Sequence, residues 1–220
     1  LCEFPVLAGG GRRGLAAAPP DALAAVLIVH DGLGITELTR RVVARLGALG
    51  YRALAVDLYD GQAAATHAEA AALMGALDER AVKAKLGTGL DELNAPGRRV
   101  AVWGFSMGGI HAFQAALDHA SVDAALVFYG DAITEAGALA ALGGPVLFVT
   151  GSADNPETGF ALSRAAGQAG KLAEVYIYPG AGHAFAQPLF AGGATYDATA
   201  TRLAFSLAED FLDRHLRGAE

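Results

Sequence analysis

Short apolar runs that alternate with segments of helical spacing are the feature that most constrains this chain. The runs are rich in Val, Leu, Ile or Phe and lack polar alternation, which is typical of strands buried on both faces of a parallel sheet. Strands that alternate with helices predict an α/β fold with a doubly wound, mostly parallel sheet flanked by helices. The expected strands cover residues 24–30, 53–57, 100–105, 124–129 and 146–150, with a weaker sixth at 175–178.

Segments with helical spacing lie between these runs, and turn-forming residues mark several of their ends. Gly50 follows the first segment, Gly170 follows the fourth, and Pro96-Gly97 precedes a strand. One segment, 66–93, is long for a single helix, so we expect Gly87-Thr88-Gly89 to divide it in two. The expected helices cover residues 36–49, 66–93, 107–119, 157–169 and 196–216.

Length and composition exclude several classes of protein. A chain of 220 residues without a linker or repeat is expected to form one domain, 1–220. Its 53% hydrophobic and 18% charged residues exclude intrinsic disorder. A net charge of −7 argues against a nucleic-acid partner, because phosphates require a basic face. No stretch reaches the ~18 apolar residues of a membrane-spanning helix.

The single cysteine and the first residues bear on location. Cys2 has no internal disulfide partner, and the start LCEFPVLAGG lacks the basic flank, apolar run and small-residue cleavage site of a signal peptide. We therefore expect a cytoplasmic protein. We separately expect a monomer or a weak homodimer whose partner is a small-molecule substrate.

Chemistry is expected at the carboxyl ends of the strands, where open α/β sheets bind their ligands. Five groups of candidates lie there: His30-Asp31-Gly32, Asp57 to Asp60, Ser106, Asp154 and His183.

The strongest motif is Gly104-Phe105-Ser106-Met107-Gly108-Gly109, which stands between an expected strand and an expected helix. In that context G-x-S-x-G indicates a nucleophile elbow, a strained turn that projects the serine hydroxyl above the sheet. The helix behind it offers free N–H groups to a developing oxyanion. The competing interpretation is an ordinary turn in which Ser106 begins the helix.

A serine nucleophile needs a base, and the base needs an orienting acid. In α/β-hydrolases the acid follows the serine in the chain and the histidine comes last. Asp154 and His183 meet that order, each in a glycine-containing loop directly after an expected strand. Asp154 would fix the imidazole tautomer and His183 would take the proton of Ser106. Asp131, after an earlier strand, is the rival for the acid.

The other titratable residues are expected to have structural roles. His30 is expected near the site rather than in it, and Asp57 and Asp60 are expected to cap or orient a loop. Helix-face or core positions without a catalytic role are expected for His67, His111, His119 and His215, and Cys2 is given no reactive role.

Six motifs in order resemble the dienelactone hydrolase family of α/β-hydrolases over roughly residues 4–215. The resemblance implies an α/β-hydrolase fold without a lid domain, and an ester or lactone hydrolase that needs neither a metal nor an organic cofactor. It also implies an oxyanion hole built from the backbone N–H groups of Met107 and Gly32. The motifs are VLIVHDGLG (26–34), VDLY (56–59), GFSMGG (104–109), YG (129–130), GSAD (151–154) and GHAF (182–185).

The departures from the family's type enzyme concern the nucleophile and substrate recognition. That enzyme has a cysteine at the position of Ser106 and a glutamate at that of Asp31. It also binds its substrate's carboxylate with two arginines, where this chain has Gly61 and Gln187. Neither residue can replace a bidentate arginine, so dienelactone is not expected to be the preferred substrate.

The substrate pocket is less well defined by the sequence. Asp31 either joins the hydrogen-bond network of the nucleophile or shapes the loop that carries Gly32. Tyr59, Phe105 and Phe185, with Gln187, are candidate pocket residues; the three aromatic residues are equally compatible with plain packing.

Two functions remain open: a serine hydrolase of small carboxylic esters or lactones, or an inactive α/β-hydrolase fold that binds a ligand or partner. A nucleotide-binding protein is disfavoured because the glycine cluster 9–14 lacks a following Lys-Ser/Thr, and because no G-x-G-x-x-G opens a helix after the first strand. The cluster is better explained as a turn between N-terminal strands. A metal enzyme is disfavoured because His and carboxylate ligands are not paired at usable spacing.

Overall fold

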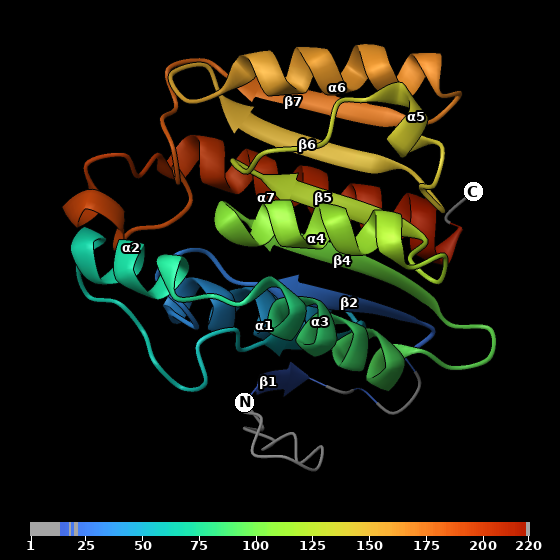
Figure 1. The fold of residues 1–220 in the computed structure, drawn as a ribbon, viewed down its shortest axis with the longest axis horizontal. Helices are drawn as coiled ribbons and strands as arrows, with labels where there is room; N and C mark the ends of the chain where they lie inside the picture. The colour runs from blue at the N-terminus through green and yellow to red at the C-terminus, as the bar shows by residue number, and fades with distance from the viewer. Residues whose placement is uncertain (1–13, 18, 20–21, 219–220) are drawn as a thin grey trace.

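A computed structural model describes residues 14–17, 19 and 22–218. Within them, seven strands form one sheet in the order β1-β3-β2-β4-β5-β6-β7, parallel except for β1, which pairs antiparallel with β3 (Figure 1). This confirms the predicted mostly parallel α/β sheet. The strands are β1 (Gly14–Ala17), β2 (Ala24–Val29), β3 (Arg52–Val56), β4 (Arg99–Phe105), β5 (Ala124–Phe128), β6 (Val146–Gly151) and β7 (Ala173–Tyr178).

Helices cover both faces of this sheet. In the view of Figure 1, α3, α4 and α6 lie in front of the sheet while α1 and α7 lie behind it. An apolar core lies on each face of the sheet. Every residue of β2, β5 and β6 is buried, because side chains on both sides of these strands are covered by helices. The helices are α1 (Glu37–Ala48), α2 (His67–Gly75), α3 (Glu79–Leu93), α4 (Met107–Asp118), α5 (Ala136–Leu139), α6 (Pro156–Gln168) and α7 (Ala198–Leu212).

The long helical segment is divided at a different place from the one predicted. The chain leaves the helix after Gly75 and begins α3 at Glu79, where the Asp78 carboxylate accepts a hydrogen bond from the Ala81 N–H at 2.8 Å. Gly87 and Gly89 lie inside α3 instead. A side chain at position 89 would collide with Leu27 of β2, because α3 passes close to that strand there.

Two short elements were not predicted, namely the single-turn helix α5 and the 3₁₀ turn Phe190–Gly193. The edge strand β1 was expected only as an N-terminal strand without bounds, and the π-helical turn Asp213–Arg217 falls at the end of the predicted helix 196–216. Most of the glycine cluster 9–14 and Cys2 lie outside the described residues. No described helix has the length and apolar character needed to cross a membrane.

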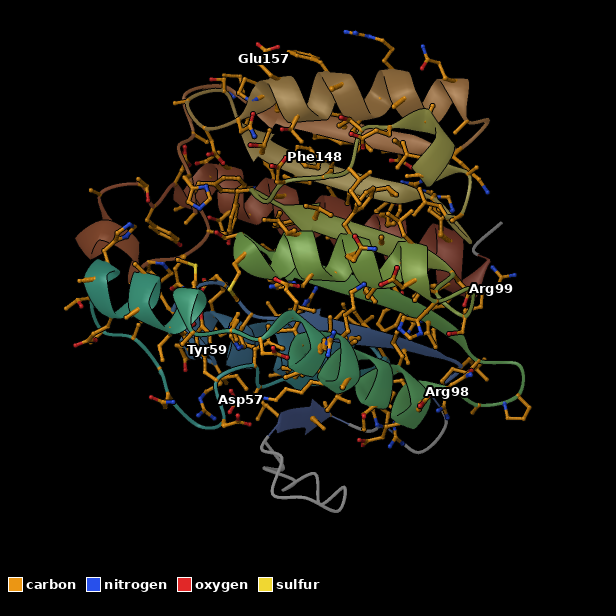
Figure 2. The ribbon with its side chains drawn as sticks, viewed as in Figure 1. Asp57, Tyr59, Arg98, Arg99, Phe148 and Glu157 are labelled. Atoms are coloured by element: carbon orange, nitrogen blue, oxygen red, sulfur yellow. The ribbon has the colours of Figure 1, made fainter. Side chains whose placement is uncertain are left out.

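The parallel strands all end at the same edge of the sheet, to the left in Figure 1, and α2 lies beside this edge. In Figure 2, Asp57 and Tyr59 appear toward this end, whereas Arg98 and Arg99 lie at the opposite end. The candidate functional residues are therefore gathered at the carboxyl edge.

Candidate active site

Ser106 occupies a strained turn between β4 and α4. Its backbone has φ 52° and ψ −120°, in the left-handed half of conformational space that non-glycine residues rarely adopt. The flanking glycines make the turn possible. A side chain at Gly104 would collide with the carbonyl of Gly108, and one at Gly108 would collide with the carbonyl of His30. The structure thus has the sharp strand-to-helix turn predicted for this motif.

Ser106, His183 and Asp154 form a continuous chain of polar contacts. The Ser106 Oγ lies 2.9 Å from His183 Nε2, and His183 Nδ1 lies 3.0 and 3.1 Å from the two carboxylate oxygens of Asp154. Asp154 follows β6 and His183 follows β7, so the sheet brings together residues that are far apart in the chain. With Nδ1–H donating to the carboxylate, Nε2 is left to accept the serine proton.

Secondary contacts orient this chain of residues. The Thr150 hydroxyl lies 3.3 Å from an Asp154 oxygen, and the Tyr129 ring packs edge-on against the His183 ring at 5.8 Å. Sequence reasoning missed a role for Tyr129, although its place directly after β5, at the carboxyl edge, was a usable signal.

Asp131, the rival acid, is directed elsewhere. It is exposed, and its carboxylate accepts hydrogen bonds from the Ala132 N–H at 2.9 Å and the Thr158 hydroxyl at 3.1 Å. The geometry therefore favours Asp154 as the partner of His183.

The two expected oxyanion donors are linked by one tyrosine. The Tyr59 hydroxyl donates to the Gly32 carbonyl at 3.2 Å and lies 3.5 Å from the sulfur of Met107. Met107 is the first residue of α4, so its N–H has no acceptor within the helix. Among the described residues the Gly32 N–H has no hydrogen-bond acceptor. Met74 of α2 packs against Gly32, a contact that no sequence signal indicated.

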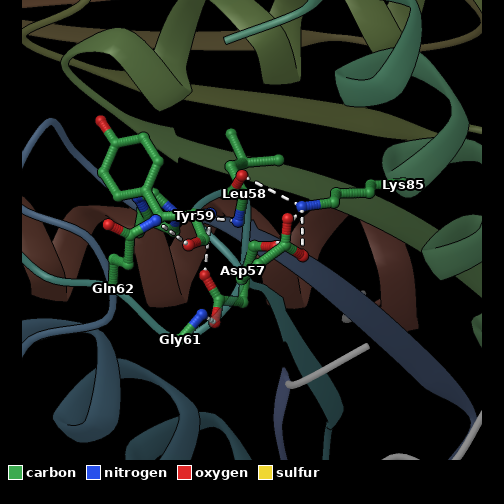
Figure 3. Close-up of polar contacts among 8 residues, drawn as sticks. Asp57, Leu58, Tyr59, Gly61, Gln62 and Lys85 are labelled. Carbon is green, nitrogen blue, oxygen red and sulfur yellow. Dashed lines mark hydrogen bonds and ion pairs between the residues drawn. The ribbon is translucent and has the colours of Figure 1, made fainter. Parts of the chain in front are cut away.

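The turn after β3 is held by internal hydrogen bonds. The Asp57 carboxylate accepts from the backbone N–H groups of Tyr59 at 2.9 Å and Gly61 at 2.6 Å (Figure 3). Lys85 of α3 donates to the carbonyls of Asp57 and Leu58 and to the carboxylate of Asp60. Asp57 and Asp60 therefore shape a loop, as predicted.

Asp31 lies in a buried polar cluster beneath the site. Its carboxylate accepts from the Leu33 N–H at 2.9 Å and from the Gln187 amide at 2.7 Å, and that amide also donates to the Thr36 hydroxyl at 3.1 Å. Burial raises the pKa of Asp31, and the hydrogen bond from Gln187 opposes that rise. Asp31 thus shapes the loop that carries Gly32.

Three of the expected pocket residues are core residues instead. Phe105 is 2% exposed, and Phe185 and Gln187 are each 0% exposed. Phe105 points to the back face with Trp103 because alternate residues of β4 share a face, and Phe185 packs between Tyr129 and Tyr178. For Phe105 and Phe185 this is the packing interpretation that the sequence left open, and the Gln187 side chain is likewise enclosed. Tyr59 and Asp31 are nearly buried as well and act through the hydrogen bonds described above.

His119 and His215 have contacts elsewhere in the structure, and His119 lies beside Gly87 of α3. His215 lies 3.5 Å from the Glu174 carboxylate, and burial lowers the pKa of His111. Within the described part of the chain, no group of three or more His, Cys, Asp or Glu residues is arranged to hold a metal ion.

Comparison with known proteins agrees with this architecture. A protein of Methylorubrum extorquens named as a carboxymethylenebutenolidase is 31% identical over 186 residues, which are 73% of this chain and 62% of that protein. This chain thus spans less than two thirds of that relative. A dienelactone hydrolase-like promiscuous phosphotriesterase from metagenomic libraries has a TM-score of 0.77 and 25% identity, with 88% of this chain and 87% of that chain covered.

A structure from Klebsiella pneumoniae that is named as a dienelactone hydrolase has a TM-score of 0.78 at 22% identity, over 92% of this chain and 93% of that one, which supports the fold. Residues 13–216 match the dienelactone hydrolase family. The chain therefore belongs to the dienelactone hydrolase family and has the α/β-hydrolase fold.

Proposed function

We propose that this hydrolase cleaves small carboxylic esters or lactones through an acyl-enzyme formed on Ser106. The observation that carries the proposal is the 2.9 Å contact between Ser106 Oγ and His183 Nε2 on a strained elbow, with Asp154 on the far side of the imidazole. A nucleophile, a base and an orienting acid in this order are the requirements of acyl transfer.

In the proposed first half-reaction, His183 takes the hydroxyl proton as the serine oxygen attacks the ester carbon. The carbonyl oxygen becomes an oxyanion, which accepts hydrogen bonds from the backbone N–H groups of Gly32 and Met107. The C–O bond to the alcohol then breaks, and His183 returns the proton to the leaving oxygen. In the second half-reaction water replaces the alcohol, and hydrolysis restores Ser106. Asp154 accepts the Nδ1–H hydrogen bond of His183 and stabilises the imidazolium.

The surroundings favour substrates without a carboxylate. Gly61 and the buried Gln187 stand where the type enzyme has arginines, and neither offers a positive charge. The nearby cation Lys85 is held by three oxygens of the turn after β3 (Figure 3). Arginine at position 61 would also be strained, since Gly61 has φ 92°. Neutral esters and lactones are therefore the proposed substrate class, and the reaction uses only groups of this chain.

The direct test is labelling with a fluorophosphonate probe, followed by hydrolysis of p-nitrophenyl esters of increasing acyl length, with lactones and dienelactone alongside. Wild-type protein should be labelled and active, and Ser106→Ala should lose both properties. Ser163→Ala, on the exposed face of α6, is the matched control. Absence of labelling and of hydrolysis in wild-type protein would favour the alternative, an inactive fold that binds a ligand or partner.

A further inference from the structure

His30, at the end of β2, uses both ring nitrogens in hydrogen bonds although the proposed reaction does not involve it. Its side chain is buried, with Nδ1 2.7 Å from the Asp31 carbonyl oxygen and Nε2 3.1 Å from the backbone nitrogen of Leu58. The Leu58 N–H can only donate, so Nε2 must accept. The proton of the neutral ring is therefore on Nδ1, which donates to the Asp31 carbonyl.

The carbonyl that His30 holds belongs to the peptide unit that contains the Gly32 N–H. Because a peptide unit is planar and trans, fixing the Asp31 C=O also fixes the direction of the Gly32 N–H. The Gly34 N–H donates to the same carbonyl at 3.1 Å. Hydrogen bonds to a carbonyl also polarise its peptide, which strengthens the N–H as a donor.

The next peptide unit is held as well. The Tyr59 hydroxyl donates to the Gly32 carbonyl, and the Tyr59 ring packs on His30 with ring centroids 4.8 Å apart. Both peptide units that flank the Gly32 Cα are thus bound by side chains. The Nε2 side of His30 is anchored in the turn after β3, which Asp57 and Lys85 brace (Figure 3).

We propose that His30 is a positioning residue that aims the Gly32 N–H at the developing oxyanion through its Nδ1–H bond to the Asp31 carbonyl. This inference rests on the proposed function, in which Gly32 is an oxyanion donor. Preorganised donors stabilise a transition state because they need no reorientation as charge develops. Loss of the Nδ1 donor should therefore lower kcat and leave KM almost unchanged.

A matched pair of variants separates the two nitrogens. In His30→Asn the amide nitrogen can occupy the place of Nδ1 and donate to the Asp31 carbonyl. In His30→Gln the amide oxygen can occupy the place of Nε2 and accept from Leu58, but the donor is lost. Removing one oxyanion donor costs about 10²–10³ in kcat. Turning the Gly32 N–H away from the oxyanion should cost less, so we expect kcat of His30→Gln to be about tenfold or more below that of His30→Asn. KM for p-nitrophenyl acetate should agree within about twofold.

Thermal unfolding of both variants is measured alongside, since a purely structural role predicts that kcat follows stability rather than the donor. Equal kcat values in the two variants, with active wild-type protein and inactive Ser106→Ala, would overturn this inference and leave the proposed function intact. Wild-type protein without esterase activity would overturn both.

A measurement on wild-type protein covers the case in which the variants do not fold. Nitrogen-15 spectra of the histidine rings should show the Nδ1–H tautomer for His30 at neutral pH. The Nε2–H tautomer would overturn the inference.

Discussion

Replacement of Gln187 by leucine should destabilise the protein by removing the amide that binds a buried carboxylate. Gln187 donates to Asp31 at 2.7 Å and to Thr36 at 3.1 Å, and its side chain is completely buried. A hydrogen bond to a charged acceptor contributes about 1.5–3 kcal/mol. In a protein of this size each kcal/mol shifts Tm by about 2–4 °C, so we expect Tm to fall by about 3–12 °C.

The pH dependence of this deficit gives the prediction its specificity. Burial raises the pKa of Asp31, so the folded state binds this proton more tightly than the unfolded state. Stability contributed by Asp31 is present at low pH and is lost as pH rises through the folded pKa. The amide favours the carboxylate, so Gln187→Leu raises that pKa further. The deficit should be complete above the folded pKa and shrink as Asp31 takes a proton on acidification.

Thermal and urea unfolding between pH 3.5 and 8 measure both effects. Gln168→Leu, on the exposed face of α6, is the control for an added leucine and should shift Tm little. A loss below about 0.5 kcal/mol, or a deficit of constant size across the pH range, would refute the assigned role of the Gln187–Asp31 contact.

Three further predictions concern the site. Asp154→Asn should lower kcat by several powers of ten by presenting the wrong imidazole tautomer, whereas Asp131→Asn should retain activity. Steady-state kinetics on the two folded variants measure this, and loss of activity in Asp131→Asn but not in Asp154→Asn would show that the acid is misplaced. Neutral short-chain esters should have kcat/KM at least tenfold above matched esters with a free carboxylate, since a buried bidentate charge contact contributes about 2–5 kcal/mol and is missing here; a preference for the anion would require another cation in the pocket. Burial lowers the pKa of His30, with Lys85 acting in the same direction and the carboxylates of Asp31 and Asp57 opposing it. The folded state therefore binds fewer protons at His30 than the unfolded state, and stability should fall as pH drops below ~6.5. His30→Asn should flatten that part of the urea-unfolding profile, and parallel profiles of the two proteins would contradict the assignment.

Buried strands were the part of the fold most predictable from sequence. The apolar runs at 24–30, 100–105 and 146–150 match β2, β4 and β6 to within about one residue, because a strand buried on both faces has no polar positions. The edge strand β1 and the single-turn α5 lack such a run. The division at Asp78 was missed because its cap is a local signal weaker than two glycines. Both glycines lie inside α3, and Gly89 allows the close approach of Leu27.

In the candidate site, the motif residues could be predicted from the sequence, whereas the positions of their neighbouring side chains could not. Ser106, Asp154 and His183 could be chosen from chain order and strand ends, and the structure brings them within hydrogen-bond distance. Phe105 and Gln187 could not be placed, because whether a side chain beside a motif faces the pocket or the core depends on packing from distant elements. Strand alternation shared with Trp103 was a signal for Phe105.

The backbone of Ser106 carries a consequence for how this protein divides its stability. A residue with a Cβ at φ 52° costs roughly 1–2 kcal/mol relative to glycine, and the surrounding sheet and helix must hold it there. Ser106→Gly should therefore yield a protein that is inert toward esters yet unfolds at a higher temperature than the active one. The side chain that supplies the reactive hydroxyl is thus also the cause of the backbone strain that lowers thermal stability. Sequences released from selection for hydrolysis would be expected to drift toward glycine at this position.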